Sequence, residues 1–397
     1  MSNNIIDHDP ESAKTFINSI RTRHLKALYQ SVTNKKLIIE IENKINLILE
    51  ELENVFLSVI YLKELTPKSK DHILSFGERL SNELLYGNLK EQNIPVKSFT
   101  GGEAGIITDA CFTEANLLSN LTNHEVKKVL SPLIKKGIIP IITGFNAVTQ
   151  DGVITTLGRG GSDYTATILG VALEADEIWI WTDVDGLMTA DPKIVSQAKQ
   201  IKSMSLPEAM ELAVFGAKVI YPRSLEPAIN HNLKIRLKNT FNPKNPGTLI
   251  SNTLNKGKTD VKAVSLIKNS GLITIIGSSM ISTPGTAAKI LDILGKKGIK
   301  IQIISQSASE ANISLVTSGN DLQNAVNTLE FSLLGRGTIK EIISETKVSI
   351  VAVIGAGMQG IPGIAARVFT AVAKNNINIK VIAQGSSEYN ISFVVNE

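Results

Sequence analysis

The sequence has 397 residues, which corresponds to roughly two or three domains and is ample for a sizeable hydrophobic core. Lysine and arginine together number 41 and aspartate and glutamate 37, so no electrostatic attraction to nucleic acid or to an anionic membrane surface is expected. The single cysteine, Cys111, excludes an intramolecular disulfide and a thiolate metal cluster and suits a reducing compartment, so we expect a cytoplasmic protein.

The first part of the chain reads as helical. Apolar residues recur at three- and four-residue spacing in segments 12–32 and 37–62, which predicts two helices whose apolar faces need a partner. A further helix is predicted within 63–94, after Pro67. Glu78 lies in that helix, where a glutamate is usually a solvated surface residue.

From residue 94 onward, predicted strands alternate with predicted helices. The strands are expected at 94–99, 138–145, 177–186 and 234–240, and the helices at 121–137, 165–175, 204–220 and 221–232. This alternation indicates a mostly parallel α/β sheet with helices on both faces. Ligands bind beyond the carboxyl ends of the strands in such sheets, which directs attention to the loops within 143–163 and 181–193.

The segment TTLGRGGSDYT, 155–165, is a candidate anion site. Three glycines surround Arg159, and Ser162 and Asp163 precede an apolar run. Ser or Asp at that place is a helix N-cap signal, and a helix N-terminus favours anions. Arg159 adds a planar fork suited to a carboxylate or a phosphate. An ordinary strand–loop–helix joint explains the segment equally well.

A polar segment rich in Pro, Gly and Asn at 243–259 predicts a domain boundary, and the remainder contains a direct repeat. The blocks that begin at Gly277 and Ile303 recur 78 residues later, at Gly355 and Val381. We expect a duplicated strand–helix–strand–strand unit. The first copy continues with an amphipathic helix over 321–334, whereas the second ends without one, so the chain looks truncated at its C-terminus.

The segment GAGMQG, 355–360, formally fits the dinucleotide fingerprint G-x-G-x-x-G. The equivalent GSSMIS of the first copy keeps one glycine, and no acidic residue ends the strand that follows. A repeated strand–helix turn is therefore favoured over binding of a nicotinamide cofactor.

Several motifs occur in the order that aspartate kinases show. They are GERL at 77–80, TTLGRGGSDYTA at 155–166, WTDVDGLMTADPK at 181–193, FGAKVIYPRSLEPA at 215–228 and RLKNTFNPKNPGTLI at 236–250. The two repeats resemble the tandem regulatory ACT domains of that family. The chain is therefore identified as similar to single-function, archaeal-type aspartate kinases. It lacks the family's opening K-F-G-G-T-S block, so we expect an N-terminal truncation as well.

The resemblance implies an amino-acid kinase fold, with its N-terminal strands missing, followed by two α+β, ferredoxin-like ACT domains. The implied catalytic domain covers 1–250 and the linker 251–260. The first ACT domain covers 269–347, and the second combines 261–268 with 348–397.

The resemblance also implies the activity: transfer of the γ-phosphoryl group of ATP, with Mg²⁺, to the side-chain carboxylate of L-aspartate. This is the first step of lysine, threonine and methionine biosynthesis. Arg159, Asp163 and Lys218 are the implied catalytic residues, and no metal ligand is assigned. The implied substrate-binding residues are Glu78, Phe145, Arg159, Gly161, Ser162 and Asp163. The implied nucleotide-binding residues are Thr182, Asp183, Met188, Asp191, Lys193 and Lys218.

An amino-acid effector, threonine or lysine, is implied at the ACT pair, together with a homodimer or higher oligomer. The implied effector-binding residues are Met280, Gly285, Thr286, Ala287, Gln306, Asn312, Gln384 and Asn390. Neither nucleic acid nor a membrane is an expected partner. A non-catalytic regulatory subunit or inactive fragment of the same family is the alternative, and a kinase of another amino acid is a further one.

Overall fold

The computed structural model describes residues 9–216, 219–252, 260–277, 285–306, 312–334 and 339–397. The chain divides into two compact units, one of Met1–Ile180 with Ile220–Arg236 and the other of Trp181–Val219 with Leu237–Glu397. The predicted catalytic domain, 1–250, contributes residues to both units. Among the described residues, no helix combines the length and the apolar character needed to cross a membrane.

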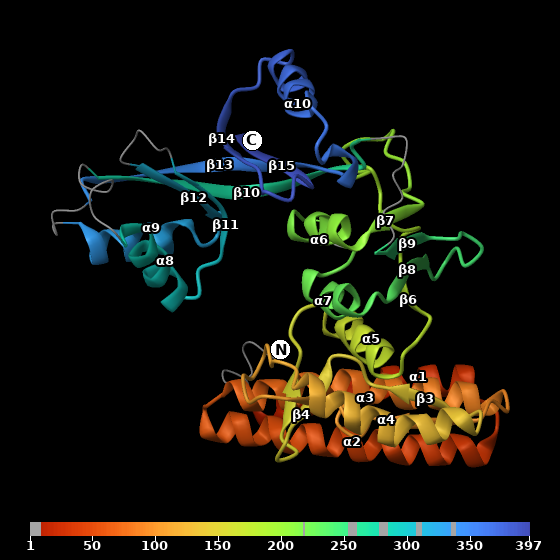
Figure 1. The fold of residues 1–397 in the computed structure, drawn as a ribbon. Helices are drawn as coiled ribbons and strands as arrows, with labels where there is room; N and C mark the ends of the chain where they lie inside the picture. The colour runs from red at the N-terminus through yellow and green to blue at the C-terminus, as the bar shows by residue number, and fades with distance from the viewer. Residues whose placement is uncertain (1–8, 217–218, 253–259, 278–284, 307–311, 335–338) are drawn as a thin grey trace. The chain divides into compact units, whose positions relative to one another are not determined.

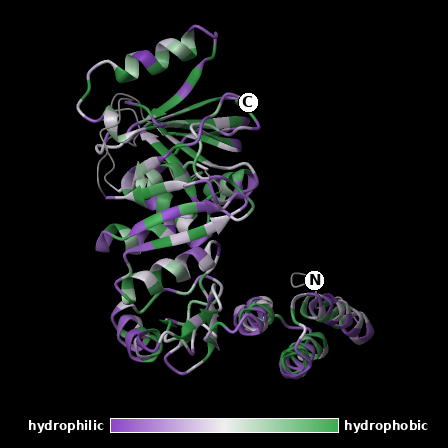
Figure 2. Ribbon diagram, turned by 90° about the vertical axis from the view of Figure 1, so that its right-hand side faces the viewer, coloured by the Kyte–Doolittle hydropathy of each residue, from purple (hydrophilic) through white to green (hydrophobic). Residues whose placement is uncertain are grey.

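Three helices open the first unit (Figure 1): α1 (Pro10–Ser31), α2 (Lys35–Leu62) and α3 (Pro67–Glu91). Each begins at a side-chain cap, because Asp9, Asn34 and Thr66 accept hydrogen bonds from first-turn N–H groups. Each helix carries both apolar and polar residues (Figure 2), and the apolar ones form one core with α2 at its centre. The helices predicted from periodicity are confirmed.

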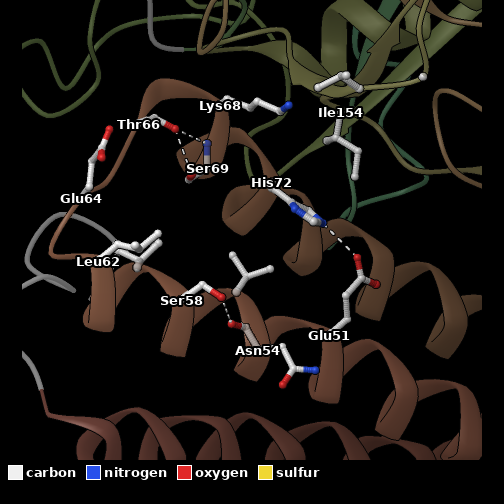
Figure 3. A pocket seen from close by; sticks show the side chains of 14 residues that line it. Glu51, Asn54, Ser58, Leu62, Glu64, Thr66, Lys68, Ser69, His72 and Ile154 are labelled. Atoms are coloured by element: carbon white, nitrogen blue, oxygen red, sulfur yellow. Dashed lines mark hydrogen bonds and ion pairs between the residues drawn. The ribbon is translucent and has the colours of Figure 1, made fainter.

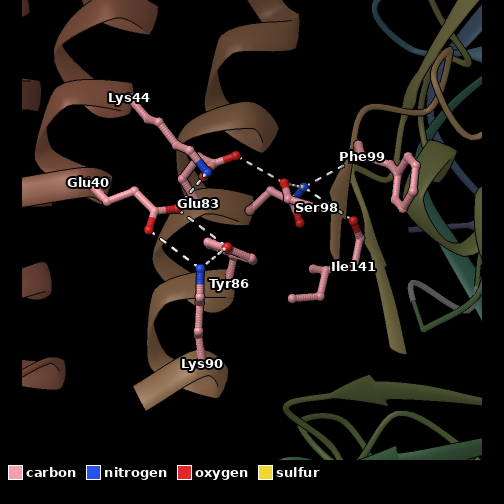
Figure 4. Close-up of polar contacts among 9 residues, drawn as sticks. Glu40, Lys44, Glu83, Tyr86, Lys90, Ser98, Phe99 and Ile141 are labelled. Atoms are coloured by element: carbon pink, nitrogen blue, oxygen red, sulfur yellow. Dashed lines mark hydrogen bonds and ion pairs between the residues drawn. The ribbon is translucent and has the colours of Figure 1, made fainter. Parts of the chain in front are cut away.

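Ion pairs join α2 to α3 beside this core (Figure 4). Lys44 Nζ lies 3.1 Å from a carboxylate oxygen of Glu83, and Lys90 Nζ lies 3.4 Å from one of Glu40. The hydroxyl of Ser98 donates to the second oxygen of Glu83 at 2.9 Å. Since Ser98 belongs to the first strand of the chain, the network fixes α3 against the strands as well as against α2.

The strands of the first unit form small sheets. Strands β1 (Val96–Phe99) and β3 (Ile139–Ile142) pair in parallel, and β2 (Ile107–Thr108), β4 (Asn146–Thr149) and β5 (Ile154–Thr156) form a second sheet. The helices α4 (Ser119–Lys135), α5 (Gly161–Ala172) and α7 (Pro222–His231) complete the unit. The antiparallel hairpin of β4 and β5 occupies part of the segment predicted to be a loop. Its strands are too short for a strand pattern to stand out.

A four-stranded sheet has the order β6-β8-β9-β7, and β6 (Glu177–Thr182) and β8 (Lys234–Asn239) run across the division between the units. The strands β7 (Ser203–Ser205) and β9 (Thr248–Ser251) pair in parallel. The helix α6 (Leu206–Val214) follows β7 and starts with a capping box of Ser205 and Glu208. The predicted helix 204–220 is therefore too long; Gly216 has a φ of +102° that ends it.

The rest of the second unit is one antiparallel sheet with the order β11-β12-β10-β13-β15-β14. Its strands are β10 (Ala263–Ile276), β11 (Ile301–Gln306), β12 (Asn312–Ser318), β13 (Glu341–Ile354), β14 (Ile379–Ala383) and β15 (Asn390–Asn396), and its helices are α8 (Thr286–Lys296), α9 (Leu322–Leu333) and α10 (Ile364–Ala373). The predicted repeat is confirmed as β10–α8–β11–β12 and β13–α10–β14–β15. The long pairing of β10 with β13 joins the two copies into one sheet.

The GAGMQG segment forms a short 3₁₀ turn, Ala356–Met358, after β13. The next helix, α10, begins only at Ile364, and Met358 is buried in the core of the second repeat. A dinucleotide fingerprint must open a helix at its glycines, so this geometry lacks the required feature.

Candidate functional site

The start of α5 is an uncapped helix N-terminus. Gly160, with a φ of +74°, occupies the N-cap position, and no side chain bonds there. Ser162 and Asp163 lie inside the first turn, so the prediction that they cap the helix is wrong. A residue without a side chain at the cap leaves the first-turn donors available, and no hydrogen bond is described for the N–H groups of Ser162 and Asp163.

The loop before β4 packs directly on this helix start. Phe145 has a φ of +66°, a conformation that non-glycine residues rarely adopt. It is held there because its N–H donates to Thr165 Oγ1 at 3.0 Å and its carbonyl accepts from the N–H of Leu157 at 2.9 Å. A Cβ on Gly161 would lie 2.8 Å from the Phe145 ring. Gly161 is therefore required by close packing, and Phe145 lies against the start of α5, where its role in lining a substrate site stays a prediction.

Arg159 is exposed just before α5, and one side of its guanidinium is fixed. Its Nε donates to the hydroxyl of Tyr221 at 2.7 Å, and its guanidinium carbon lies 5.2 Å from the centre of that ring. No partner is described for its two terminal nitrogens. These nitrogens form the end of the fork that binds a carboxylate in bidentate fashion.

Glu78 and Asp163 are two half-buried carboxylates without a described partner. Burial raises the pKa of each. Glu78 lies near the loop of Phe145, because the side-chain amide of Asn146 donates to the carbonyl of Ser75, three residues before Glu78 on α3. These contacts join α3, the loop of Phe145 and the start of α5.

The loop after β6 belongs to the second unit. Asp183 and Lys193 are exposed, Thr182 donates to the Asp183 carboxylate at 3.2 Å, and Met188 is half-buried. Asp191 organises the turn by accepting from the N–H of Lys193 at 2.8 Å. Lys218 lies outside the described residues, and its role stays a prediction.

Asp185 and Gly186 have structural roles in the same loop. The Asp185 carboxylate accepts from the amides of Asn239 and Asn242, at 2.8 and 3.2 Å. Gly186 has a φ of +131°, and a Cβ there would lie 2.4 Å from Thr248 Oγ1. These contacts explain why the Asp-Gly pair sits at this turn.

The predicted effector residues lie at matching places in the two repeats. Gly285, with Thr286 and Ala287 after it, caps α8 at a φ of +85°, as Gly363 caps α10 at +86°. Asn312 and Asn390 begin β12 and β15, while Gln306 ends β11 and Gln384 follows β14. Asn390 is already engaged, because its amide donates to Glu211 of α6. Met280 lies outside the described residues.

Two residues that sequence reasoning missed support the site: Tyr221 and Asp71. Tyr221 stands before Pro222 at the start of α7, and Asp71 is a fully buried carboxylate on α3. Asp71 bonds to Thr156 of β5, and no local pattern marks either contact.

A cavity of about 730 Å³ lies elsewhere in the first unit, between α2, the start of α3 and the β4–β5 hairpin (Figure 3). Its polar lining includes His72, which bonds to Glu51 at 2.9 Å, and Lys68. It includes none of the predicted site residues. The described part of the chain also contains no group of three or more His, Cys, Asp or Glu side chains that could hold a metal ion.

Comparisons with known proteins agree with this architecture. The model of the amino acid kinase family matches residues 7–239, and an ACT domain model matches 273–333 and 351–397. The aspartate kinase of Pseudomonas putida is 34% identical over 83% of this chain and 79% of its own length. Aspartokinase 1 of Arabidopsis thaliana, a chloroplastic protein, is 34% identical over 88% of this chain.

The solved structures include aspartokinase III of E. coli in complex with aspartate and ADP, in the R-state. It is 28% identical, with a TM-score of 0.82, and the match covers all of this chain and 87% of that one. The same enzyme in complex with lysine and aspartate, in the T-state, gives a TM-score of 0.79 at 27% identity, over all of this chain and 86% of that one. The chain spans 62% to 65% of the length of the Arabidopsis relatives that it matches.

Proposed function

The chain belongs to the amino acid kinase family and, within it, to the aspartate kinases, and from this premise we propose that it phosphorylates the side-chain carboxylate of L-aspartate with ATP. Two opposite charges in the first unit carry the proposal: the guanidinium of Arg159 and the carboxylate of Glu78. No partner is described for the terminal nitrogens of Arg159 or for the Glu78 carboxylate. L-aspartate presents an ammonium group and a side-chain carboxylate besides its α-carboxylate, and such a pair of charges binds the ammonium group and the side-chain carboxylate in a defined orientation.

The chemistry requires no general base. The attacking carboxylate is already ionised at neutral pH, so catalysis depends on positioning and on neutralising negative charge. Arg159 would hold the substrate carboxylate, and the free N–H groups at the start of α5 would add donors in the same region. Phe145, Gly161, Ser162 and Asp163 would line the substrate site.

The loop after β6 is the proposed nucleotide site. Thr182, Asp183, Met188, Asp191 and Lys193 would contact ATP, and Lys218 its phosphates. Mg²⁺ is usually held by phosphates, waters and one or two carboxylates. Bound in that way, the ion would neutralise charge on the phosphates during transfer.

The ACT repeats are the proposed regulatory part. Threonine or lysine would bind at the matched loops and strand ends, in a homodimer or larger oligomer of a cytoplasmic enzyme. The bond from Asn390 to Glu211 supports this proposal, because it links a predicted effector residue to α6 within one compact unit. An effector that occupies Asn390 would shift the population between two arrangements of that link.

The activity is tested on the chain as it stands. The purified protein is incubated with ATP, Mg²⁺, L-aspartate and hydroxylamine, and aspartyl hydroxamate and ADP are measured. We expect both products, each dependent on aspartate, with L-glutamate a poor substitute. A folded protein that forms neither product but binds threonine or lysine in calorimetry would contradict the proposal and favour the non-catalytic regulatory alternative.

A further inference from the structure

One face of α3 carries a row of four polar residues. Asp71, Ser75, Glu78 and Asn82 follow at spacings of four, three and four residues, which places them one above the other on a helix. Three of these positions are bonded to the strand layer. The carboxylate of Asp71 bonds to β5, the carbonyl of Ser75 to the amide of Asn146, and the amide of Asn82 to carbonyls at the ends of β1 and β3. Glu78 is the member left without a described partner.

Asp71 makes the strongest of these attachments. It is 0% exposed, and its Oδ2 accepts from the N–H of Thr156 at 3.0 Å and from the N–H of Thr113 at 2.8 Å. Its Oδ1 accepts from the hydroxyl of Thr156 at 2.7 Å. Burial of a carboxylate is unfavourable unless it is hydrogen-bonded, and three charge-assisted bonds satisfy this one.

The position of Asp71 in the chain gives these bonds a second consequence. Thr156 ends β5, and Arg159 follows three residues later. Glu78 follows Asp71 by seven residues, about two helical turns. One buried carboxylate therefore joins the element that carries Glu78 to the element that carries Arg159.

A second attachment acts nearer to Glu78. Asn146, 3% exposed, donates from Nδ2 to the carbonyl of Ser75 at 3.1 Å, and no partner is described for its Oδ1. A buried acceptor without a hydrogen bond is unfavourable, and an apolar side chain at position 146 would not have one. We therefore attribute the role of Asn146 to its other amide atom, Nδ2, which bonds to α3. Asn146 directly follows Phe145, which ties this contact to the same loop.

We propose that Asp71 is a positioning residue that sets the separation between the carboxylate of Glu78 and the guanidinium of Arg159, with Asn146 as a second attachment. Asp71 touches no substrate in this scheme. With the ammonium group on Glu78 and the side-chain carboxylate on Arg159, this separation matches the length of the side chain, so that L-aspartate is preferred over L-glutamate. The inference rests on the proposed function, since it assigns the two charges to the two ends of one substrate.

The test uses two matched threonines. Thr156→Val removes the hydroxyl donor to Asp71 and keeps the backbone N–H. Thr122→Val is the control: Thr122 is also 0% exposed, and its hydroxyl bonds to the backbone of Ile107, between α4 and β2. We expect Thr156→Val to raise the KM for aspartate about fivefold, the factor for one hydrogen bond, while the KM for ATP stays constant. The preference for aspartate over glutamate should fall. Thr122→Val should lower Tm and leave both kinetic parameters unchanged.

Asp71→Ala and Asp71→Asn extend the test. The asparagine keeps the shape. Its amide oxygen can accept from the N–H groups of Thr113 and Thr156, and its amide nitrogen can donate to the Thr156 hydroxyl oxygen once that hydroxyl rotates. It should therefore restore most of the aspartate affinity that the alanine loses. If Asp71→Ala does not fold, the kinetics of Thr156→Val decide the test.

Aspartate binding is also measured by calorimetry. An unmodified chain that fails to bind aspartate would overturn the proposed function and this inference with it. If the unmodified chain binds aspartate, and Thr156→Val binds it with the same affinity and the same preference over glutamate, the inference is overturned and the proposed function is not.

Discussion

Arg159 and Tyr221 lie 62 residues apart in the chain, yet the Nε of the arginine donates to the phenol oxygen at 2.7 Å. The contact joins the loop before α5 to the start of α7. It uses the one guanidinium donor that points away from the end of the fork, so the terminal nitrogens are oriented before any ligand arrives. Such preorganisation raises affinity because less side-chain freedom is lost on binding.

The first prediction concerns this contact. Tyr221→Phe keeps the ring and removes the hydroxyl, so we expect the KM for aspartate to rise about three- to tenfold, as for the loss of one hydrogen bond. Arg159→Ala removes the charged fork, and a rise of about a hundredfold is expected. Steady-state kinetics with varied aspartate measures both. Unchanged kinetics in Arg159→Ala would exclude it from the substrate site.

The second prediction compares two glycines that have nearly the same backbone conformation. Gly160 has a φ of +74° and Gly137 a φ of +73°, but a Cβ would lie 2.5 Å from the Tyr221 ring at Gly160, whereas nothing lies within 4 Å at Gly137. Gly137→Ala should cost about 1 kcal/mol of unfolding free energy from the backbone alone. Gly160→Ala should cost a further 1–3 kcal/mol, approximately, from overpacking.

Urea unfolding of the two alanine variants gives this comparison directly. Because the clash displaces Tyr221, Gly160→Ala should also raise the KM for aspartate, and Gly137→Ala should not. Equal unfolding free energies for the two variants would show that the Tyr221 ring moves aside without cost.

The third prediction follows from the burial of Glu78. Burial raises the pKa of this carboxyl in the folded chain, so the folded state holds the proton more tightly than the unfolded state does. The unfolding free energy should therefore fall as pH rises from the unfolded-state pKa through the raised one. Glu78→Gln removes this loss. We expect its Tm to exceed that of the unmodified protein at pH 7 and to match it near pH 4, while its affinity for aspartate falls.

Thermal unfolding across that pH range tests the stability part, and aspartate titration tests the functional part. A Tm for Glu78→Gln below that of the unmodified protein at pH 7 would mean that the carboxylate has a stabilising partner in the folded chain.

Local patterns were sufficient for some of these features and insufficient for others. The helices α1 to α3 and the repeat were predictable because periodicity and a constant offset are properties of neighbouring residues. The bond between Asp71 and Thr156 joins residues 85 positions apart, and no pattern in the sequence around either residue predicts it. The cap of α5 was misassigned because Ser162 is a favourable cap residue in general, whereas close packing on Tyr221 and Phe145 requires glycines here.

The fourth prediction concerns Glu208 at the start of α6, which is 0% exposed. It accepts from Lys262 Nζ at 2.8 Å, from the N–H of Ala356 at 2.6 Å and from Ser205. Burial acts to raise the pKa of Glu208, but these bonds outweigh it and the pKa is lowered. A carboxyl with a lowered folded-state pKa contributes stability above its unfolded-state pKa and loses it as pH falls through the folded-state value.

Lys262→Met should therefore move acid unfolding to higher pH, because the ion pair that opposes burial is gone. At pH 7 we expect a loss of about 3–5 kcal/mol, as for other buried pairs that lose one partner. Lys380→Met is the control, since the Glu345 side chain of that pair is 43% exposed and the expected loss is below about 1 kcal/mol. Acid titration followed by circular dichroism measures the shift, and equal midpoints in the two variants would contradict it.

The fifth prediction separates the two equivalent asparagines of the repeats. The amide of Asn390 donates to the carboxylate of Glu211 in α6, and burial raises the pKa of that carboxyl. Without the amide, the buried Glu211 side chain loses a hydrogen bond that stabilises its ionised form. Asn390→Ala should change both basal activity and inhibition by threonine or lysine. Asn312→Ala, in the first repeat, should weaken inhibition about tenfold, as for a lost bond to a charged ligand, and leave basal activity intact. Inhibition curves for the two variants decide the matter: a parallel loss of basal activity in both would mean that these positions support the sheet and do not bind an effector.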